Sequence, residues 1–378
     1  MSRKYHLVVS VGTGRGCRAF TLVEVLVLVL VVGVLGLLLW PAASYANGRA
    51  RRVSCQRNLR ALGAALHMYA KDHGGWLPGI NTSAVALRTK RLLWQGNPDV
   101  LHDPALPVQT ADWMTPLARY AHELPANRAE RWHTLWTELK CPQQWRSAEV
   151  WSAAGAPDKA DFEEFTWPAG SYLSPMYFSY WGQQHSGTVL AVLDGFPSIP
   201  VYAEVPPSNW PVVNEDYVSR LDRVGPPAAK VFAADGTRYV DTNGDAQVDV
   251  RIAPGWYGGF ATEGPWSPIS NAYGVREGTE NWDGVVLPAG SESGGLNLLF
   301  SYRHVLPDAR SPLPPHGAGD SGACQDNDGG IHALFFDAHV ALLNDEESRT
   351  VSLWYPTGSV IAGDPVGMTT ETVGQVIP

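Results

Sequence analysis

Residues 20–40 are the feature of the sequence that most limits how this chain can fold. The segment, FTLVEVLVLVLVVGVLGLLLW, carries one charged residue, Glu24. A helix of this length spans about 30 Å, which is the thickness of the hydrocarbon core of a bilayer. A lone carboxylate inside lipid is costly unless a positive group pairs with it. The segment therefore predicts a membrane-spanning helix and raises the question of what neutralises Glu24.

The residues around Glu24 resemble the N-terminal signal of type IV prepilins and of the pseudopilins of type II secretion systems. In that signal a basic leader and a small residue precede Phe-Thr-Leu-x-Glu, and here Ala19 precedes Phe-Thr-Leu-Val-Glu. A prepilin peptidase cuts before the phenylalanine, so the resemblance implies a leader at 1–19 and a mature chain that begins at Phe20. Glycine usually precedes the cut, and Ala19 departs from that pattern.

The resemblance also implies a role for the carboxylate. Cleavage would free the α-amine of Phe20, which this family usually methylates without removing its charge. Glu24 of one subunit would then pair with the amine of the next subunit during assembly. The implied partners are the prepilin peptidase, other pilin-like subunits and the cytoplasmic membrane of a bacterium. The alternative is an ordinary signal anchor in which Glu24 is a polar residue tolerated near the membrane interface.

The charge of the chain excludes nucleic acid as its main partner. The formal net charge is -9 at pH 7, and the strongest basic cluster, NGRARRVSCQR, directly follows the apolar run. Arginines in that place suit the phosphates of lipid headgroups better than they suit a nucleic acid. The resemblance implies a single-pass protein of the cytoplasmic membrane whose head domain lies in the periplasm or at the cell exterior.

The helical pattern continues beyond the membrane segment. Apolar residues recur at steps of four and three, which places them in a stripe on one face of a helix: Cys55, Leu59, Leu62, Leu66 and Tyr69. Gly74, Gly75 and Pro78 then favour the end of that helix. The segment CQRNLRALGAALHMYAKDHGGWLP also resembles a large group of pseudopilin-like bacterial proteins.

The expected fold is α+β and pilin-like. A long helix over 20–75, with its first half in the membrane, is expected to pack its second half on an antiparallel β-sheet in a head domain over 76–378. Two further helices are expected in TADWMTPLARYAHEL, with Thr110 or Asp112 as a cap, and in NRAERWHTLWTELKCP. Short β-segments separated by Gly, Pro, Asn and Asp follow from about residue 165.

The C-terminal segment DGGIHALFFDAHVALLN is expected to form a β-hairpin. It resembles the C-terminal signature of the same bacterial group, in which a histidine and nine further residues precede Asp-Gly-His-Val. Asp337, His339 and Val340 match, and His339 is expected to be a structural turn residue. Ala338 replaces the turn glycine, which costs about 1 kcal/mol if the position needs a positive φ. No histidine lies ten residues before Asp337, and the Arg-His pair that ends at His304 suggests a loop inserted after it.

The cysteines allow at most one intrachain disulfide in the mature chain. Cys17 precedes the apolar run, and three cysteines follow it: Cys55, Cys141 and Cys324. Which of them pair is left open. Cys55 lies on the apolar stripe, where we expect a small buried hydrophobe rather than a reactive thiol. No Cys/His zinc spacing occurs in the sequence.

The segment DTNGDAQVD admits two interpretations. Four oxygen-bearing residues occupy positions 1, 3, 5 and 9 of a calcium-loop numbering: Asp241, Asn243, Asp245 and Asp249. Short side chains of this kind suit a hard cation, although Ala246 stands where such a loop has glycine. The alternative is a β-hairpin that turns at Asn243-Gly244 without a metal. Calcium is therefore a candidate cofactor.

No catalytic constellation is recognisable, and we expect a non-enzymatic subunit. The GDSG segment at 319–322 is similar to the nucleophile segment of chymotrypsin-like proteases, but its flanking residues differ and a Gly/Ser loop is expected. The first rival function is a membrane-tethered glycan- or polymer-binding protein that stacks exposed members of its 15 tryptophans on sugars. The second is a signal-anchored hydrolase that uses Ser321 or a carboxylate.

Overall fold

The computed structural model describes twelve stretches of the chain that together contain its principal elements. They are 21–92, 97–144, 147–151, 158–190, 198–202, 212–237, 246–249, 261–262, 303–305, 329–348, 350–361 and 372–378. Internal contacts divide the chain into two compact units, Met1–Ala50 and Arg51–Pro378. The second is called the head unit below. The predicted boundaries at 19/20 and 75/76 stay predictions.

Helix α1, Leu22–Asp72, is one continuous helix of 51 residues. It begins with a capping box, in which Thr21 N and Oγ1 donate to Glu24 Oε2 at 2.8 and 2.9 Å and Glu24 N donates to Thr21 Oγ1 at 3.3 Å. The apolar side chains from Leu22 to Leu37 are exposed. No helix within the described residues is both long and apolar enough to span a membrane. The membrane span expected over 20–40 therefore stays a prediction.

In the head unit α1 is amphipathic, as its periodicity predicts. The whole stripe is buried in the main hydrophobic core: Cys55, Leu59, Leu62, Leu66 and Tyr69. Arg57 and Arg60, which lie off the stripe, are exposed. The chain leaves the helix through Gly74 and Gly75, whose φ values of 63° and 90° are easily reached by glycine.

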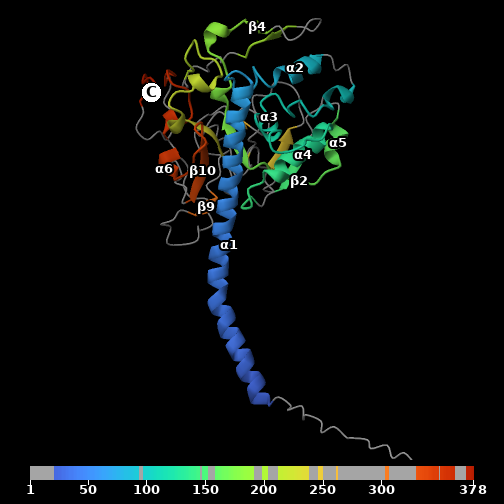
Figure 1. Cartoon of the computed structure of the whole chain (residues 1–378), viewed down its shortest axis with the longest axis vertical. Helices are drawn as coiled ribbons and strands as arrows, with labels where there is room; N and C mark the ends of the chain where they lie inside the picture. The colour runs from blue at the N-terminus through green and yellow to red at the C-terminus, as the bar shows by residue number, and fades with distance from the viewer. Residues whose placement is uncertain are drawn as a thin grey trace, which may run out of the picture. The chain divides into compact units, whose positions relative to one another are not determined.

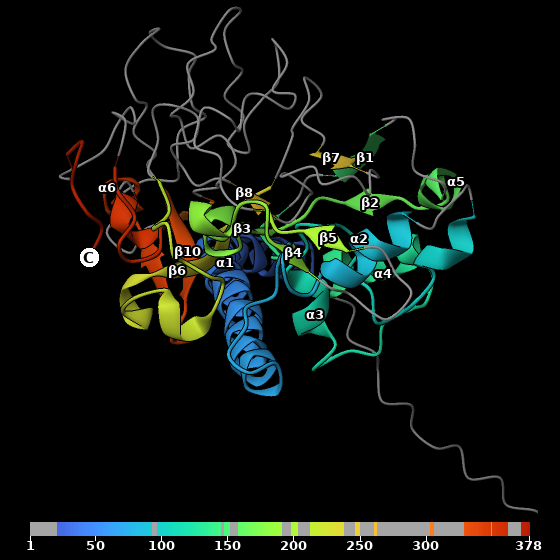
Figure 2. The same cartoon turned by 90° about the horizontal axis from the view of Figure 1, so that it is seen from above.

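The described residues of the head unit contain a six-stranded sheet in the order β11-β10-β6-β3-β8, with β9 paired to β10. The strands are β3 Tyr172–Pro175, β6 Val231–Asp235, β8 Ala261–Thr262, β9 His304–Val305, β10 Gly329–Phe335 and β11 Val340–Leu343. Neighbours are antiparallel except β3 and β8. Every residue of β6 and β10 is buried. Figures 1 and 2 show α1 of the head unit beside β10, so this sheet and this helix enclose the core.

Smaller elements surround this core. One small sheet has the order β2-β1-β7, and another pairs β4 with β5. Their strands are β1 Ser147–Trp151, β2 Trp167–Pro168, β4 Val189–Leu190, β5 Ile199–Pro200 and β7 Ala246–Asp249. The other α-helices are α2 Val85–Leu92, α3 Met114–Ala118, α4 Arg128–Glu138, α5 Lys159–Glu163 and α6 Asp345–Ser348. Short 3-10 helices occur at Pro98–Leu101, Met176–Phe178, Gln183–His185, Leu221–Arg223, Pro227–Ala229 and Val351–Leu353. In both views α2, α4 and α5 lie on one side of α1 and α6 lies on the other (Figures 1 and 2).

Both helices expected soon after residue 76 are present, but the first is short. Within the segment 110–124, which was expected to be helical, only the five residues of α3 form an α-helix. The N-cap position is Trp113 rather than Thr110 or Asp112, and it makes no side-chain cap hydrogen bond. Asp112 still binds the start of the helix, because its Oδ1 accepts hydrogen bonds from the N–H groups of Met114 and Thr115 at 2.8 and 2.9 Å. The second helix, α4, buries Trp132 of its predicted stripe completely. Burial in the core, rather than helix length, holds these apolar residues in place.

The C-terminal hairpin is confirmed as the antiparallel pair β10 and β11. Ala338 has a φ of 70°, so the residue in the place of glycine is held in the left-handed region at a cost of about 1 kcal/mol. Its methyl group faces α1, and a Cβ added to Gly63 would lie 2.9 Å from both Ala338 Cβ and Leu334 Cδ1. His339 is a turn residue, as expected, and its N–H donates to Asp337 Oδ1 at 3.1 Å.

A disulfide joins Cys55 of α1 to Cys141, which follows α4, with Cα atoms 4.9 Å apart. Both cysteines are fully buried. Cys55 is therefore buried as expected, but it is half of a bridge rather than an isolated small hydrophobe. The bridge closes a loop of 86 residues, which stabilises the fold by about 4.5 kcal/mol in the loop-closure account.

Replacing Gly63 tests the close contact between α1 and the hairpin. We expect Gly63→Ala to lower the free energy of unfolding by about 1–3 kcal/mol, because the new methyl group overpacks the contact with Leu334 and Ala338. This loss outweighs the gain of about 1 kcal/mol in helix propensity. Ala64→Ser, on the exposed face of the same helix, is the control and should change stability by less than about 0.5 kcal/mol. Chemical denaturation of the purified protein measures both, and a stabilised Gly63→Ala would contradict the packing described.

Candidate functional site

The residues predicted for processing and assembly lie at the start of α1. Ala19 and Phe20 fall outside the described residues, so the cut between them stays a prediction. Glu24 is described, and its carboxylate closes the capping box with Thr21. Both of these hydrogen bonds go to one oxygen, Oε2, and a carboxylate has lone pairs for several more. The cap therefore leaves Glu24 able to accept another partner.

The predicted calcium residues are only partly described. Asp241, Asn243 and Asp245 fall outside the described residues, as does Ser321, the nucleophile of the hydrolase alternative. Asp249 is the last residue of β7, which pairs in parallel with β1. The hairpin interpretation depends on the same turn at Asn243. Calcium binding and the metal-free hairpin both stay predictions.

The structure brings together three buried residues that the sequence does not connect. Asp235 ends β6, His304 lies in β9 and His332 lies in β10, and each is fully buried. The register of β10 with β6 sets His332 opposite Asp235, and its register with β9 sets His304 opposite Gly330. Residues two apart on a strand share a face. The three side chains therefore meet on one face of the sheet and form what is called the Asp-His-His cluster below.

The atoms of this cluster are close, but few of them are hydrogen-bonded. Asp235 Oδ2 lies 2.9 Å from His304 Nε2 and 3.4 Å from His332 Nδ1. The two imidazole centroids are 3.9 Å apart. Among the described residues, four buried atoms have no hydrogen-bond partner: Asp235 Oδ1, His304 Nδ1, His304 Nε2 and His332 Nδ1. Such proximity without hydrogen-bond alignment is uncommon for buried polar atoms.

Burial and charge act in opposite directions on the cluster. Burial raises the pKa of the Asp235 carboxyl, but the facing His304 and His332 and the nearby Arg303 hold that pKa well below its ordinary value. Burial lowers the pKa of His304, and the attraction of the Asp235 carboxylate only partly offsets this. At neutral pH Asp235 is therefore a carboxylate.

Helix α1 and the disulfide border the cluster. Gln56 Nε2 lies 3.2 Å from His332 Nε2. The sulfurs of Cys55 and Cys141 and one ring nitrogen of His304 all lie within 4.8 Å of one another. The cluster therefore lies where α1 meets β6, β9 and β10.

Sequence reasoning found only one member of this cluster, and only indirectly. The sequence suggested that His304 is the histidine of the C-terminal signature, displaced by an inserted loop. In the structure β9, which contains His304, pairs with β10 of the hairpin. Asp235 and His332 carry no local signal, because they are 97 residues apart and only strand register brings them together.

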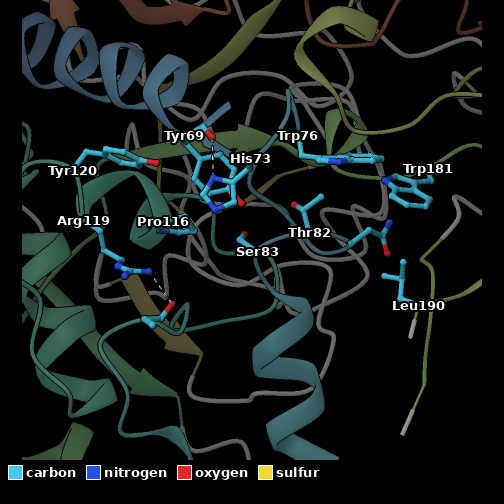
Figure 3. Close-up of a pocket in the computed structure, with 12 residues that line it drawn as sticks. Tyr69, His73, Trp76, Thr82, Ser83, Pro116, Arg119, Tyr120, Trp181 and Leu190 are labelled. Carbon is cyan, nitrogen blue, oxygen red and sulfur yellow. Dashed lines mark hydrogen bonds between the residues drawn. The ribbon is translucent and has the colours of Figure 1, made fainter. Parts of the chain in front are cut away.

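A second feature of the head unit is an open pocket of about 820 Å³ near the end of α1 (Figure 3). Its walls come from the last turn of α1, the loop that follows, the turn after α3 and the segment around Trp181. Figure 3 shows Tyr69 and His73 in the middle, with Trp76 and Trp181 to one side and Arg119 and Tyr120 to the other. Aromatic side chains therefore supply much of its wall.

The aromatic rings of the pocket are held in pairs. Trp76 stacks on Trp181 with centroids 5.4 Å apart and planes at 20°. Tyr69 stacks on His73 with centroids 3.9 Å apart and planes at 15°. The indole N–H of Trp181 is buried and has no hydrogen-bond partner among the described residues.

Neutral hydroxyl groups and a positive charge complete the pocket. Burial raises the pKa of Tyr69 to about 12. Burial and a hydrogen bond to Asp72 raise the pKa of Tyr120 to about 12, and that hydroxyl donates to Asp72 Oδ2 at 2.9 Å. Arg119 is exposed and carries the positive charge. Aromatic faces beside hydroxyl groups suit a polar ring such as a sugar.

Residues 46–196 match a family model described as a protein of unknown function (DUF1559). The match covers less than half of the 378 residues, so it is a likeness of that segment. The residues that line the pocket all lie within it, whereas the Asp-His-His cluster lies beyond it. No curated protein and no solved structure matches the chain.

Proposed function

We propose that the chain is a non-enzymatic, pilin-like subunit, a pseudopilin that a prepilin peptidase cuts after Ala19. In this proposal it assembles through α1 into a filament of a type II secretion or type IV pilus machine. The observation that carries the proposal is the contrast within α1. Its apolar side chains from Leu22 to Leu37 are exposed, whereas the stripe that begins at Cys55 is buried.

The exposed apolar part of α1 needs an apolar partner. Leu22 is 81% exposed and Leu37 is 78% exposed, and Glu24 is the one charged residue between them. In water such a surface drives association, whereas in lipid or against other apolar helices it is satisfied. A subunit that moves from a membrane into a filament meets both of these surroundings in turn.

The family match supports the head unit in this proposal rather than the membrane part. It begins at residue 46, beyond the exposed apolar residues, and includes the buried stripe of α1. The same segment, from Cys55 to Pro78, carries the sequence resemblance to pseudopilin-like bacterial proteins. We therefore propose that the head unit is the part presented in the periplasm or at the cell exterior.

Replacing the lone acid of α1 tests the proposal. We expect Glu24→Ala to be cut normally but to form few multimers, because the α-amine of Phe20 would stay unpaired in lipid. Thr21→Ala, which removes the capping hydroxyl and keeps the charge, is the matched control and should assemble. The measurements are N-terminal sequencing and crosslinking in membranes. A mature chain that does not begin at Phe20, or normal multimers from Glu24→Ala, would contradict the proposal.

The pocket favours a second candidate function, a membrane-tethered protein that binds glycans or other polymers. Trp76 is only partly buried, its ring stacks on Trp181, and the guanidinium of Arg220 lies 5.4 Å from its ring centroid. A fixed indole face of this kind is a surface on which a sugar ring can stack.

Removing the indole of Trp76 tests this second function. If the pocket binds a glycan, we expect Trp76→Ala to weaken binding about fivefold, since a stacking contact contributes about 1 kcal/mol. Val189→Ala is the control, because Val189 is 54% exposed and does not line the pocket. A glycan array selects the ligand and titration calorimetry measures the affinity. Equal affinities of Trp76→Ala and the unaltered chain would place the ligand elsewhere.

A further inference from the structure

We infer that Asp235, His304 and His332 bind a divalent transition-metal ion, and that Zn²⁺ suits the site best. The donors are two imidazole nitrogens and one carboxylate oxygen. This set suits zinc, whereas Ca²⁺ and Mg²⁺ prefer oxygen ligands alone. The inference is independent of the pilin-like proposal, because none of the three residues belongs to α1.

The spacing of the donor atoms fits a single ion. Zinc binds nitrogen and oxygen at about 2.0–2.1 Å, so adjacent ligands of a tetrahedral site lie about 3.3 Å apart. Asp235 Oδ2 lies 2.9 and 3.4 Å from the nearest nitrogens of His304 and His332. The three donor atoms lie within 4.8 Å of one another. Small side-chain adjustments therefore suffice to place an ion between them, with no change of strand register.

The missing hydrogen bonds give a second, separate reason for a ligand at this place. Buried polar atoms nearly always have hydrogen-bond partners. Within the described residues the cluster contains four that do not, on the side chains of Asp235, His304 and His332, all of them fully buried. An ion pair between Asp235 and His304 alone would leave Nδ1 of His332 and Oδ1 of Asp235 unsatisfied. A bound cation accepts one lone pair from each of the three side chains.

Two neighbouring groups hold the ligands in orientation. The backbone N–H of His332 donates to Asp235 Oδ2 at 2.7 Å, which occupies one lone pair of that oxygen and leaves its other lone pair for the ion. The amide of Gln56 lies 3.2 Å from His332 Nε2. With the amide oxygen turned toward that nitrogen, Gln56 accepts its N–H and leaves the lone pair of Nδ1 for the metal. Gln56 is therefore a positioning residue that connects the site to α1.

The burial of the site indicates a structural ion rather than a catalytic one. Asp235, His304 and His332 are inaccessible to solvent, and the ion would join β6, β9 and β10 directly beneath α1. Cys55 and Cys141 lie close by but are joined in a disulfide, so they offer no thiolate. The cluster then supplies three of the four ligands of a tetrahedral zinc site.

Metal loading of the full-length protein in detergent, with the disulfide intact, tests the inference. After stripping with chelator and titration with Zn²⁺, we expect one zinc per chain by elemental analysis and a rise in Tm. Co²⁺ in place of zinc should give the visible absorption bands of a tetrahedral nitrogen and oxygen site. A chain that binds no zinc, or one whose Tm does not respond to it, would overturn the inference. Thiolate-to-cobalt absorption would assign the ion to the cysteines and would overturn it as well.

Variants assign the ion to these residues. We expect Asp235→Asn to weaken zinc binding by more than 100-fold and Gln56→Leu to weaken it 10- to 100-fold. His339→Ala, in the exposed turn of the hairpin, is the matched control and should bind zinc normally. Where Asp235→Asn fails to fold, as judged by circular dichroism, Gln56→Leu still decides, because Gln56 is only partly buried. Normal zinc binding by Gln56→Leu and by any folded Asp235→Asn would place the ion elsewhere and reject the site.

Discussion

The close approach of α1 to the hairpin of β10 and β11 is the constraint on which the head unit depends. Gly63 makes it possible, since any side chain at that position would collide with Leu334 and Ala338. The same helix is bonded through Cys55 to Cys141 and contacts the Asp-His-His cluster through Gln56. Packing, a covalent bond and a polar contact therefore fix one face of one helix. The left-handed φ of Ala338 is the strain that this arrangement tolerates.

This fixed face allows one helix to do two different things. Over the stripe from Cys55 to Tyr69 it completes a core, and its apolar residues are removed from solvent. Over Leu22–Leu37 its apolar residues remain exposed, and in the proposed function lipid or neighbouring subunits cover them. The capping box of Thr21 and Glu24 starts the helix without consuming the carboxylate. In the proposed function, anchoring and folding would therefore depend on different parts of the same helix.

The features that the sequence predicted are those whose signals are local. Three features depend on residues a few positions apart, where helix and strand periodicity apply: the stripe of α1, the hydrogen bonds of Asp112 to the start of α3 and the hairpin at Ala338. The disulfide was left open among three cysteines, because only the packing of α1 against the end of α4 selects Cys141. The same reason explains why the Asp-His-His cluster and the pairing of Trp76 with Trp181 were not predicted. Strand register and loop packing over about a hundred residues bring those side chains together.

The described strands of the head unit are short, so bonds beyond backbone pairing and core packing would add to its stability. Within the described residues β9 is the pair His304–Val305, which gives two ladder positions with β10. β6, at the centre of the sheet, has five residues. A ligand bond from His304 to an ion shared with Asp235 and His332 would hold β9 by a stronger contact than backbone pairing. The disulfide beside it joins α1 to the residue that follows α4. The ion would therefore hold the strands, and the disulfide holds the helix.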